Sequence, residues 1–220
     1  MKRERGAMTA LYPLPVVLVT AGAGDEADMI TIAWCGTVNG SPPMAAVAVR
    51  HSRHSYSLLC RTREFVINVP RAGQADVVDM AGLESGRAVD KFRTYGLTAA
   101  PATHVAPPLI AECPVNIECV IRHQLELGSH DLFIGEVVAV HADEELLDEK
   151  GGIDVARLDP VAYMEGEYWS LGARIGEFGF TAPIVRQRTQ AAAGAADAGT
   201  AAPAESSDTG TASARPSGES

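Results

Sequence analysis

The sequence predicts a mainly β fold, in which short strands form a closed or partly closed antiparallel barrel with a few helical insertions. Short runs rich in Val, Ile and Thr recur early in the chain, and Gly, Pro, Asp or Asn bounds each of them. Two longer runs of the same kind follow, joined by residues with hairpin-turn chemistry. Because few helical stretches separate these many strands, the pattern favours an antiparallel barrel.

The predicted elements follow in chain order. Short strands are expected over residues 14–20, 29–37, 44–50 and 64–70, and longer ones over residues 115–127 and 132–141. The turn between the longer strands is Gly128-Ser129-His130-Asp131. Helices are expected over residues 53–61, with Ser52 as the N-cap, and over residues 74–83, where apolar residues recur at helical spacing.

The composition is that of an ordinary globular protein, and its charge excludes nucleic acid as a general partner. Of 220 residues, 46% are hydrophobic and 21% are charged, and the formal net charge is −10. A polyanion needs a basic face, which an excess of acidic residues does not supply. The sequence shows neither a signal-peptide pattern nor the ~20 apolar residues of a membrane helix. The four cysteines form no CxxC pair, so we expect a reduced, cytoplasmic protein without a membrane partner.

The chain changes character after Arg188. Residues 189–220 contain no Val, Ile, Leu, Met, Phe, Tyr or Trp, and Ala, Gly, Ser, Thr and Pro dominate them. Such a segment cannot bury enough apolar surface to offset its ordering entropy. We therefore expect a flexible N-terminus over residues 1–10, one folded domain over residues 11–188, and a disordered tail over residues 189–220.

An ordered series of motifs runs through the folded domain. It begins with Tyr12-Pro13-Leu14-Pro15-Val16-Val17-Leu18-Val19-Thr20 and continues through Thr31-Ile32-Ala33-Trp34-Cys35-Gly36, Val47-Ala48-Val49-Arg50 and Glu64-Phe65-Val66-Ile67-Asn68-Val69-Pro70. Ser85-Gly86, Asp90-Lys91-Phe92 and Gly128-Ser129-His130-Asp131-Leu132-Phe133-Ile134-Gly135-Glu136-Val137 complete it. In this order and at this spacing, the series resembles the flavin reductase family, including its flavoredoxin-like members, over residues 10–180. The resemblance implies a Greek-key split β-barrel, non-covalently bound FMN, and a homodimer with each flavin near the subunit interface.

The residues after the third predicted strand suit the anionic phosphate of FMN. Arg50 ends that strand, and the helix expected after Ser52 has Ser55 in its first turn. A guanidinium, two hydroxyls and the free N–H groups of a helix start form an anion site. The alternative is that Arg50 is a solvated loop residue and Ser52 is only a cap. The resemblance favours the anion site and also places Lys91, otherwise typical of a surface charge, near the cofactor.

The flat flavin ring needs a strand with small side chains, and residues 31–35 supply one. Alternation along a strand puts Thr31, Ala33 and Cys35 on one face, and Ile32 and Trp34 on the other. The resemblance places this strand along the edge of the isoalloxazine ring. We favour contact between Cys35 and the ring without redox chemistry, because a buried free cysteine usually behaves as a small apolar residue. Trp34 is expected in the core rather than stacked on the ring.

Two further polar residues lie in or beside predicted strands. Asn68 interrupts an apolar strand and needs a hydrogen-bond partner, which either FMN or a group in the core would provide. His130 lies at the hairpin turn, where an isolated histidine is usually exposed and idle, whereas the resemblance implicates it in nicotinamide binding. The resemblance also assigns cofactor contacts to Ser85 and Phe92. No cluster of ligand-type residues accompanies the histidines, so no metal site is expected.

The function that the resemblance implies is FMN-dependent oxidoreduction, in which NAD(P)H delivers hydride to flavin N5. The electrons would then pass to free flavin, a partner oxygenase or another acceptor such as a metal chelate or dioxygen, while this chain orients the ring and stabilises its charge. Two alternatives stay open. One is an FMN electron carrier without nicotinamide activity, whose acidic surface suits a basic partner; the other is a split-barrel binding module without catalysis. Bound yellow flavin would exclude the module, and oxidation of NAD(P)H would separate the enzyme from the carrier.

Overall fold

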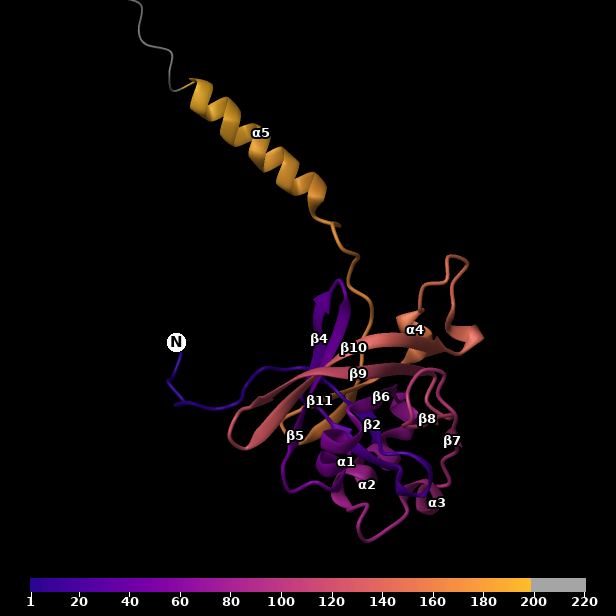
Figure 1. The fold of residues 1–220 in the computed structure, drawn as a ribbon. Coiled ribbons are helices and arrows are strands. Elements are labelled where there is room, and N and C mark those ends of the chain that lie inside the picture. The colour runs from indigo at the N-terminus through magenta and orange to yellow at the C-terminus, as the bar shows by residue number, and fades with distance from the viewer. Residues whose placement is uncertain (199–220) are drawn as a thin grey trace, which may run out of the picture. The chain divides into compact units, whose positions relative to one another are not determined.

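Seven antiparallel strands form a curved sheet in the order β3-β2-β6-β9-β10-β5-β4, which confirms the predicted mainly β, partly closed barrel (Figure 1). The computed structural model describes residues 1–198, and this sheet lies in the first of two units, Met1–Gly172. Its strands are β2 (Val17–Ala21), β3 (Asp28–Ile32), β4 (Cys35–Gly40), β5 (Pro43–Arg50), β6 (Glu64–Val69), β9 (Val115–Glu126) and β10 (His130–Ala142).

Smaller elements surround this sheet. A three-stranded sheet joins β1 (Leu14–Pro15), β11 (Val161–Met164) and β12 (Glu167–Ser170), and β7 (Ala99–Ala100) pairs with β8 (Leu109–Ile110). The helices of this unit are α1 (His54–Thr62), α2 (Ala75–Leu83), α3 (Lys91–Tyr95) and α4 (Val155–Leu158). Short 3₁₀ turns are η1 (Gly24–Glu26), η2 (Ala72–Gln74) and η3 (Glu144–Leu146).

The inside of the curved sheet holds the main apolar core. Alternate residues of β2 and β3, among them Val19 and Ile30, point into it, and α1 adds Leu58 and Leu59. The opposite face of β2 packs against α2 in a second apolar cluster. Because both of its faces are buried, β2 is apolar at nearly every position rather than at alternate ones.

The strand expected over residues 29–37 is instead two strands. β3 ends at Ile32 and β4 begins at Cys35, with a bend at Ala33 and Trp34. β3 pairs with β2, whereas β4 pairs with β5, so the bend carries the chain from one edge of the seven-stranded sheet to the other. A continuous strand cannot serve both edges, and the break therefore closes the barrel at this point.

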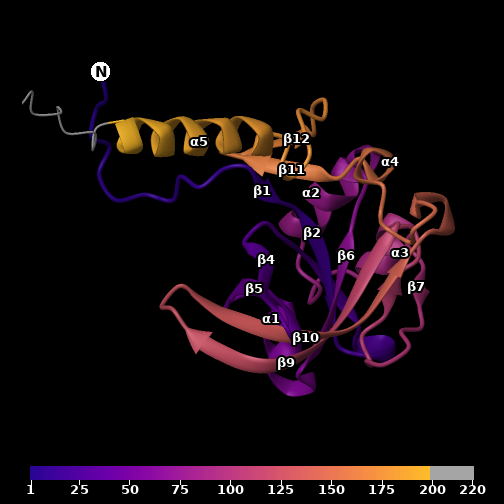
Figure 2. The ribbon, with the colours of Figure 1, turned by 90° about the horizontal axis from the view of Figure 1, so that it is seen from above.

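The β9–β10 hairpin extends beyond the neighbouring strands (Figures 1 and 2). Leu127 N donates to His130 O at 3.0 Å, so Gly128 and Ser129 are the two central residues of the turn. Gly128 has a φ of +89°, which glycine adopts at little cost, and glycine at the first central position is typical of a type II′ turn. The predicted turn is confirmed, but His130 is already the first residue of β10, where it pairs with Arg50.

The turn between β5 and α1 differs from the prediction by one residue. Helix α1 begins at His54, and its N-cap is Arg53 in an extended conformation. Ser52 lies in the turn before it, so the prediction that Ser52 caps this helix is wrong. The first N–H groups of α1 consequently receive no side-chain cap from the described residues.

The second unit begins at Ala173 and contains α5 (Ala182–Ala198). This helix begins before Thr189, where the sequence predicts the disordered tail to start, and continues to Ala198. These residues are rich in alanine, which has the highest helix propensity, and a segment can be helical without large apolar side chains. The rest of the predicted tail, residues 199–220, lies outside the described residues. None of the helices within residues 1–198 is both long and apolar enough to cross a membrane.

Candidate functional site

A cleft of about 850 Å³ opens beside the bend between β3 and β4. This volume lies in the range of small-molecule sites. All residues from Ile30 to Cys35 line the cleft, together with the ends of β5 and β10, the N-terminal segment and the β11–β12 turn. Other lining residues are Met8, Thr9, Ala10, Leu11, Tyr12, Leu14, Ala48, Arg50, Arg53, His130, Tyr163, Glu165 and Gly166.

A smaller pocket of about 110 Å³ adjoins the cleft, because Ile30 and Arg53 line both. Its other walls come from the start of β3, the start of α1, the loop between α2 and α3, and the start of α3. Apart from Ile30 and Gly86, every lining side chain is polar or charged; these are Asp28, Ser52, Arg53, His54, Ser55, Glu84, Ser85 and Lys91. The structure therefore places a small polar pocket beside a larger cleft.

The mouth of the cleft carries a histidine held between an arginine and a tryptophan. Arg50 Nε donates to His130 Nε2 at 3.3 Å, and His130 Nδ1 lies 2.8 Å from Ser129 Oγ, which fits a neutral imidazole with its proton on Nδ1. Burial, and then the positive charge of Arg50, lower the pKa of His130 below its ordinary value. The ring centroids of Trp34 and His130 are 4.7 Å apart. Trp34 is 42% exposed, so the prediction that it belongs to the core is wrong.

Residues 31–35 line the cleft together, although strand alternation predicted that they would divide between two faces. The bend at Ala33 and Trp34 cancels that alternation. Thr31 Oγ1 donates to the carbonyl oxygen of Val78 in α2, so this hydroxyl is already engaged. Burial raises the pKa of the Cys35 thiol to about 12. A thiol that stays protonated supports the prediction of a packing contact without redox chemistry.

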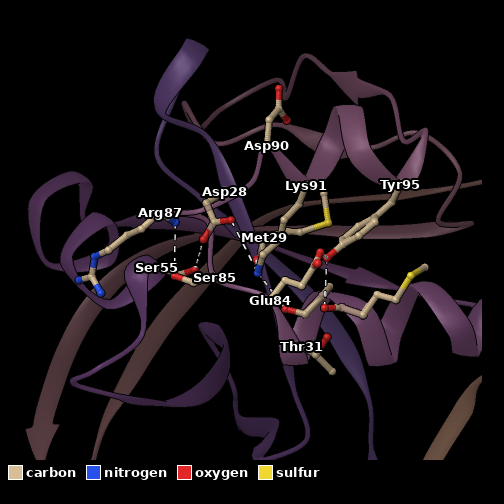
Figure 3. A network of polar contacts seen from close by, with 12 residues as sticks. Asp28, Met29, Thr31, Ser55, Glu84, Ser85, Arg87, Asp90, Lys91 and Tyr95 are labelled. Carbon is tan, nitrogen blue, oxygen red and sulfur yellow. Dashed lines mark hydrogen bonds and ion pairs between the residues drawn. The ribbon is translucent and has the colours of Figure 1, made fainter.

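Two polar residues that line the pocket, Lys91 and Ser55, are buried. Lys91 is 4% exposed, and its Nζ donates to Met29 O at 2.7 Å and to Ala81 O at 2.8 Å. Burial lowers the pKa of Lys91. Ser55 is also buried and donates to Asp28 Oδ2 at 2.7 Å (Figure 3).

The polar pocket also holds an unsatisfied group. His54 Nδ1 is buried, and among the described residues it has no hydrogen-bond partner. Buried polar atoms are nearly always paired, so an unpaired nitrogen on a residue that lines the pocket suggests a ligand or water beside it. Ser52 and Ser85 line the same pocket from two different loops.

Two predicted cofactor contacts lie in neither cavity. Asn68 is fully buried; its Nδ2 donates to Leu18 O at 3.0 Å, and its Oδ1 accepts from Ile110 N at 2.9 Å and from Asn116 Nδ2 at 2.8 Å. Its hydrogen-bonding groups are thus used inside the core, the alternative role that the sequence left open. Phe92 packs against the second apolar cluster. The structure therefore does not bring Asn68 and Phe92 together with the predicted cofactor contacts that line the cleft and the pocket.

Sequence reasoning missed Arg53 and the N-terminal segment. Arg53 lies at the junction of the cleft and the pocket, one residue beyond Ser52, the N-cap that the sequence predicts. If α1 is taken to begin at His54, one residue later than predicted, Arg53 becomes the N-cap residue beside the predicted phosphate site. Met8 to Ala10 line the cleft, although residues 1–10 were expected to be a flexible terminus. An irregular segment of this kind leaves no periodic signal in the sequence.

A buried carboxylate fixes the turn that carries Arg50 and Arg53. Asp131 is 0% exposed and accepts hydrogen bonds from His51 Nε2 at 2.5 Å, Tyr56 OH at 2.8 Å and Gln124 Nε2 at 2.7 Å. The hydrogen bond from His51, followed by that from Gln124, lowers the pKa of Asp131 to about 2. The carboxylate thereby ties the β5–α1 turn and α1 to the β9–β10 hairpin.

Comparison with known proteins places this architecture in a family. The family model described as "Flavin reductase like domain" matches residues 8–172. The chain belongs to the flavin reductase family. Its split β-barrel fold is therefore the one that the sequence predicted.

The chain is also similar to individual proteins in sequence and in structure. A protein of Archaeoglobus fulgidus is 34% identical over 144 residues, which cover 66% of this chain and 81% of that protein. The structure of flavoredoxin of Desulfovibrio vulgaris (Miyazaki F) is similar with a TM-score of 0.77 and 34% identity, over 83% of this chain and 100% of that chain. The FMN-binding protein from Thermus thermophilus is similar with a TM-score of 0.67 and 26% identity, over 80% of this chain and 98% of that chain.

Proposed function

We propose that this chain binds FMN without a covalent bond and uses it to transfer electrons from NAD(P)H to a second acceptor. The observation that carries this proposal is the pair of adjoining cavities, because they differ as the two ends of FMN differ. The larger cleft suits a flat ring, and the small polar pocket suits a phosphate. Membership of the flavin reductase family and similarity to an FMN-binding protein support the same cofactor.

The residues of the polar pocket fit a phosphate. Arg53 supplies a guanidinium where the two cavities join, and the start of α1, whose N–H groups receive no side-chain cap, lines the same pocket. The unpaired His54 Nδ1 is a ready hydrogen-bonding group, and Ser52 and Ser85 add hydroxyls. A phosphate in this pocket would offer hydrogen-bond acceptors to these groups.

The residues of the cleft fit a flavin ring. The backbone from Ala33 to Cys35 would hydrogen-bond the polar edge of the ring and steady the charge that it gains on reduction. Bound FMN supplies a ring that accepts hydride from a nicotinamide and passes the electrons on. Neutral His130, held by Arg50 at the mouth, would contact the nicotinamide amide group and orient its ring over the flavin.

The test is oxidation of NADH and of NADPH by the purified full chain, followed by the absorbance of the reduced nicotinamide. With added FMN and dioxygen, we expect oxidation well above the rate of free FMN alone. A protein that binds FMN but leaves both nicotinamides untouched would contradict the enzymatic part of the proposal. A protein that binds no flavin would contradict all of it and would favour a split-barrel module with another ligand.

The second candidate function is an FMN electron carrier that meets a protein donor. The similarity to flavoredoxin, which extends over all of that chain, favours it specifically. In this case FMN would be reduced by dithionite and reoxidised by a protein acceptor, while NAD(P)H would not react. The net charge of −10 suits a basic partner protein for either function.

The functional unit that we propose is a homodimer. Val38 on β4 is 53% exposed, and Leu125 and Leu127 on the β9–β10 hairpin are 47% and 60% exposed. In the second unit, Phe178 and Phe180 are also largely exposed. Apolar surface of this kind is typically covered by a partner. Sedimentation at about twice the chain mass is expected, and a stable monomer at micromolar concentration would contradict the dimer.

A further inference from the structure

The polar pocket proposed for a phosphate contains an acidic residue in its wall. Asp28, the first residue of β3, is 5% exposed and lines this pocket. Figure 3 shows its carboxylate between the Ser55 hydroxyl and the Lys91 ammonium. A buried carboxylate repels an anion at close range, and the repulsion is strong where water is scarce. Its presence beside a phosphate site therefore needs an explanation.

Asp28 occupies the two groups that would otherwise serve a phosphate best. Ser55 Oγ donates to Asp28 Oδ2 at 2.7 Å, and Lys91 Nζ lies 3.8 Å from Asp28 Oδ1. Lys91 Nζ also donates hydrogen bonds to Met29 O and Ala81 O. The Ser55 hydroxyl therefore already donates its hydrogen bond to Asp28, and the Asp28 carboxylate offsets much of the positive charge of Lys91.

The loop between α2 and α3 packs closely against the Asp28 carboxylate at Gly86. A Cβ atom built on Gly86 would lie 2.3 Å from Asp28 Oδ1, so only glycine allows the loop to approach this closely. The same loop adds a second carboxylate to the pocket, that of Glu84, which accepts a hydrogen bond from Tyr95 OH. The lining thus has two cationic side chains, Arg53 and Lys91, and two carboxylates, so their formal charges cancel.

We propose that Asp28 is a specificity-determining residue that lowers the affinity of the pocket for phosphate and keeps FMN exchangeable. Its carboxylate holds the Ser55 hydroxyl, offsets the charge of Lys91 and repels the ligand. FMN bound in this way can leave the protein and act as a substrate or carrier in solution. The inference rests on the proposed flavin site and goes beyond it, because it states how tightly and in which role FMN is bound.

The experiment is a titration of the flavin-free full chain with FMN and with riboflavin, which has the same ring and lacks the phosphate. Asp28→Asn keeps the side-chain shape and removes the charge. We expect it to bind FMN about tenfold more tightly than the wild type, because the Lys91 charge is no longer offset and no carboxylate at this position repels the phosphate. Riboflavin affinity should change by less than about twofold.

Two further variants make the result specific. Asp25→Asn is the matched control, since Asp25 is exposed, lines neither cavity and changes the net charge equally; its FMN affinity should equal that of the wild type. Glu84→Gln removes the second, more exposed carboxylate and should tighten FMN in the same direction but less. If Asp28→Asn does not fold, Glu84→Gln decides the question.

The outcomes separate this inference from the proposed function. If the wild type prefers FMN to riboflavin but both pocket variants bind FMN equally or more weakly, the inference is overturned, and Asp28 is instead a positioning residue for Ser55 and Lys91. If the wild type shows no preference for FMN, the phosphate assignment itself fails, and the inference fails with it.

Discussion

The cleft and the polar pocket adjoin, yet they are built in different ways. The cleft is formed by backbone at the β3–β4 bend and by rings such as Trp34 and His130. The pocket is lined mainly by charged and hydroxyl side chains, and Asp28 contacts both Ser55 and Lys91. We infer that ring binding depends on shape, which a single substitution changes little. Phosphate binding depends on a balance of charges, which a single substitution changes strongly.

The largest effect is expected at the junction of the two cavities. Arg53→Ala should weaken FMN by about ten- to a hundredfold, because a hydrogen bond to a charged group contributes about 1.5–3 kcal/mol. Riboflavin should lose much less, since it offers no phosphate to the guanidinium. Flavin fluorescence titration measures both dissociation constants.

The matched control for this prediction is Arg50→Ala, the residue to which the sequence assigned the phosphate. Arg50 lines only the cleft and donates to His130, so its removal should cost FMN less than removal of Arg53. A larger loss of FMN affinity in Arg50→Ala than in Arg53→Ala would indicate that Arg50 binds the phosphate. It would contradict the separate roles assigned to the cleft and the pocket.

Another buried carboxylate, that of Glu118, lies outside both cavities and has a purely structural role. Glu118 is 0% exposed; it accepts from the backbone N–H groups of Thr103, His104 and Val105 and from His141 Nε2. Glu118→Gln should lower the free energy of unfolding by about 2 kcal/mol, because an amide N–H group would then face these donors. The preference for FMN over riboflavin should stay as in the wild type. A changed preference would show that this region is coupled to the pocket.

The same carboxylate predicts an acid limit to stability. Burial alone would raise the pKa of Glu118, but the hydrogen bonds from Thr103, His141, His104 and Val105 lower it overall. A group whose pKa is lower in the folded state stabilises the fold above its ordinary value of 4.5, and that stability is lost as the pH falls through the folded pKa. Thermal unfolding measured from neutral to acidic pH should therefore show a steeper loss in the wild type than in Glu118→Gln.

A smaller effect is expected at the mouth of the cleft. His130→Ala should raise KM for NAD(P)H about fivefold, the equivalent of one neutral hydrogen bond, and leave FMN affinity nearly unchanged. Because the pKa of His130 is lowered, its imidazole is neutral above about pH 6.5, and KM should be constant above that pH. Steady-state kinetics from acidic to alkaline pH check both expectations. A loss of FMN affinity as large as the rise in KM would place His130 against the flavin instead.

The smallest effect concerns the second unit. A chain that ends at Arg188 lacks the alanine-rich part of α5 and everything after it. Since residues 189–220 carry no large apolar side chain, the melting temperature should shift by less than about 2 °C and bound flavin should be retained. Calorimetry of both chains tests this, and a larger shift would show that the segment packs on the barrel.

The fold could be predicted well because its signals are local. The strands of β5, β6, β9 and β10, and the helices α1 and α2, follow from apolar runs and their boundary residues. The division of residues 29–37 into β3 and β4 could not be predicted in this way, because the sequence remains apolar across the bend. The strand is interrupted because the chain passes here from one edge of the seven-stranded sheet to the other, which is a feature of the tertiary structure.

The site could be predicted only in part, for a similar reason. Residue type does not distinguish Asn68, whose partners lie in the core, from a polar residue that faces a ligand. Residue type alone makes Lys91 a surface charge, and only the family resemblance places it near the cofactor; in the structure two backbone carbonyls hold it inside. Arg53 was missed because its importance comes from its place between two cavities, which depends on where α1 begins. Such distinctions rest on hydrogen bonds between segments distant in sequence.

The most direct test of the two-cavity site is the ratio of two dissociation constants for the wild-type chain. The flavin-free protein is titrated with FMN and with riboflavin under identical conditions. If the small pocket holds the phosphate through Arg53 and the start of α1, FMN should bind at least about tenfold more tightly than riboflavin, even with Asp28 opposing it. Equal dissociation constants would contradict the assignment of phosphate to this pocket.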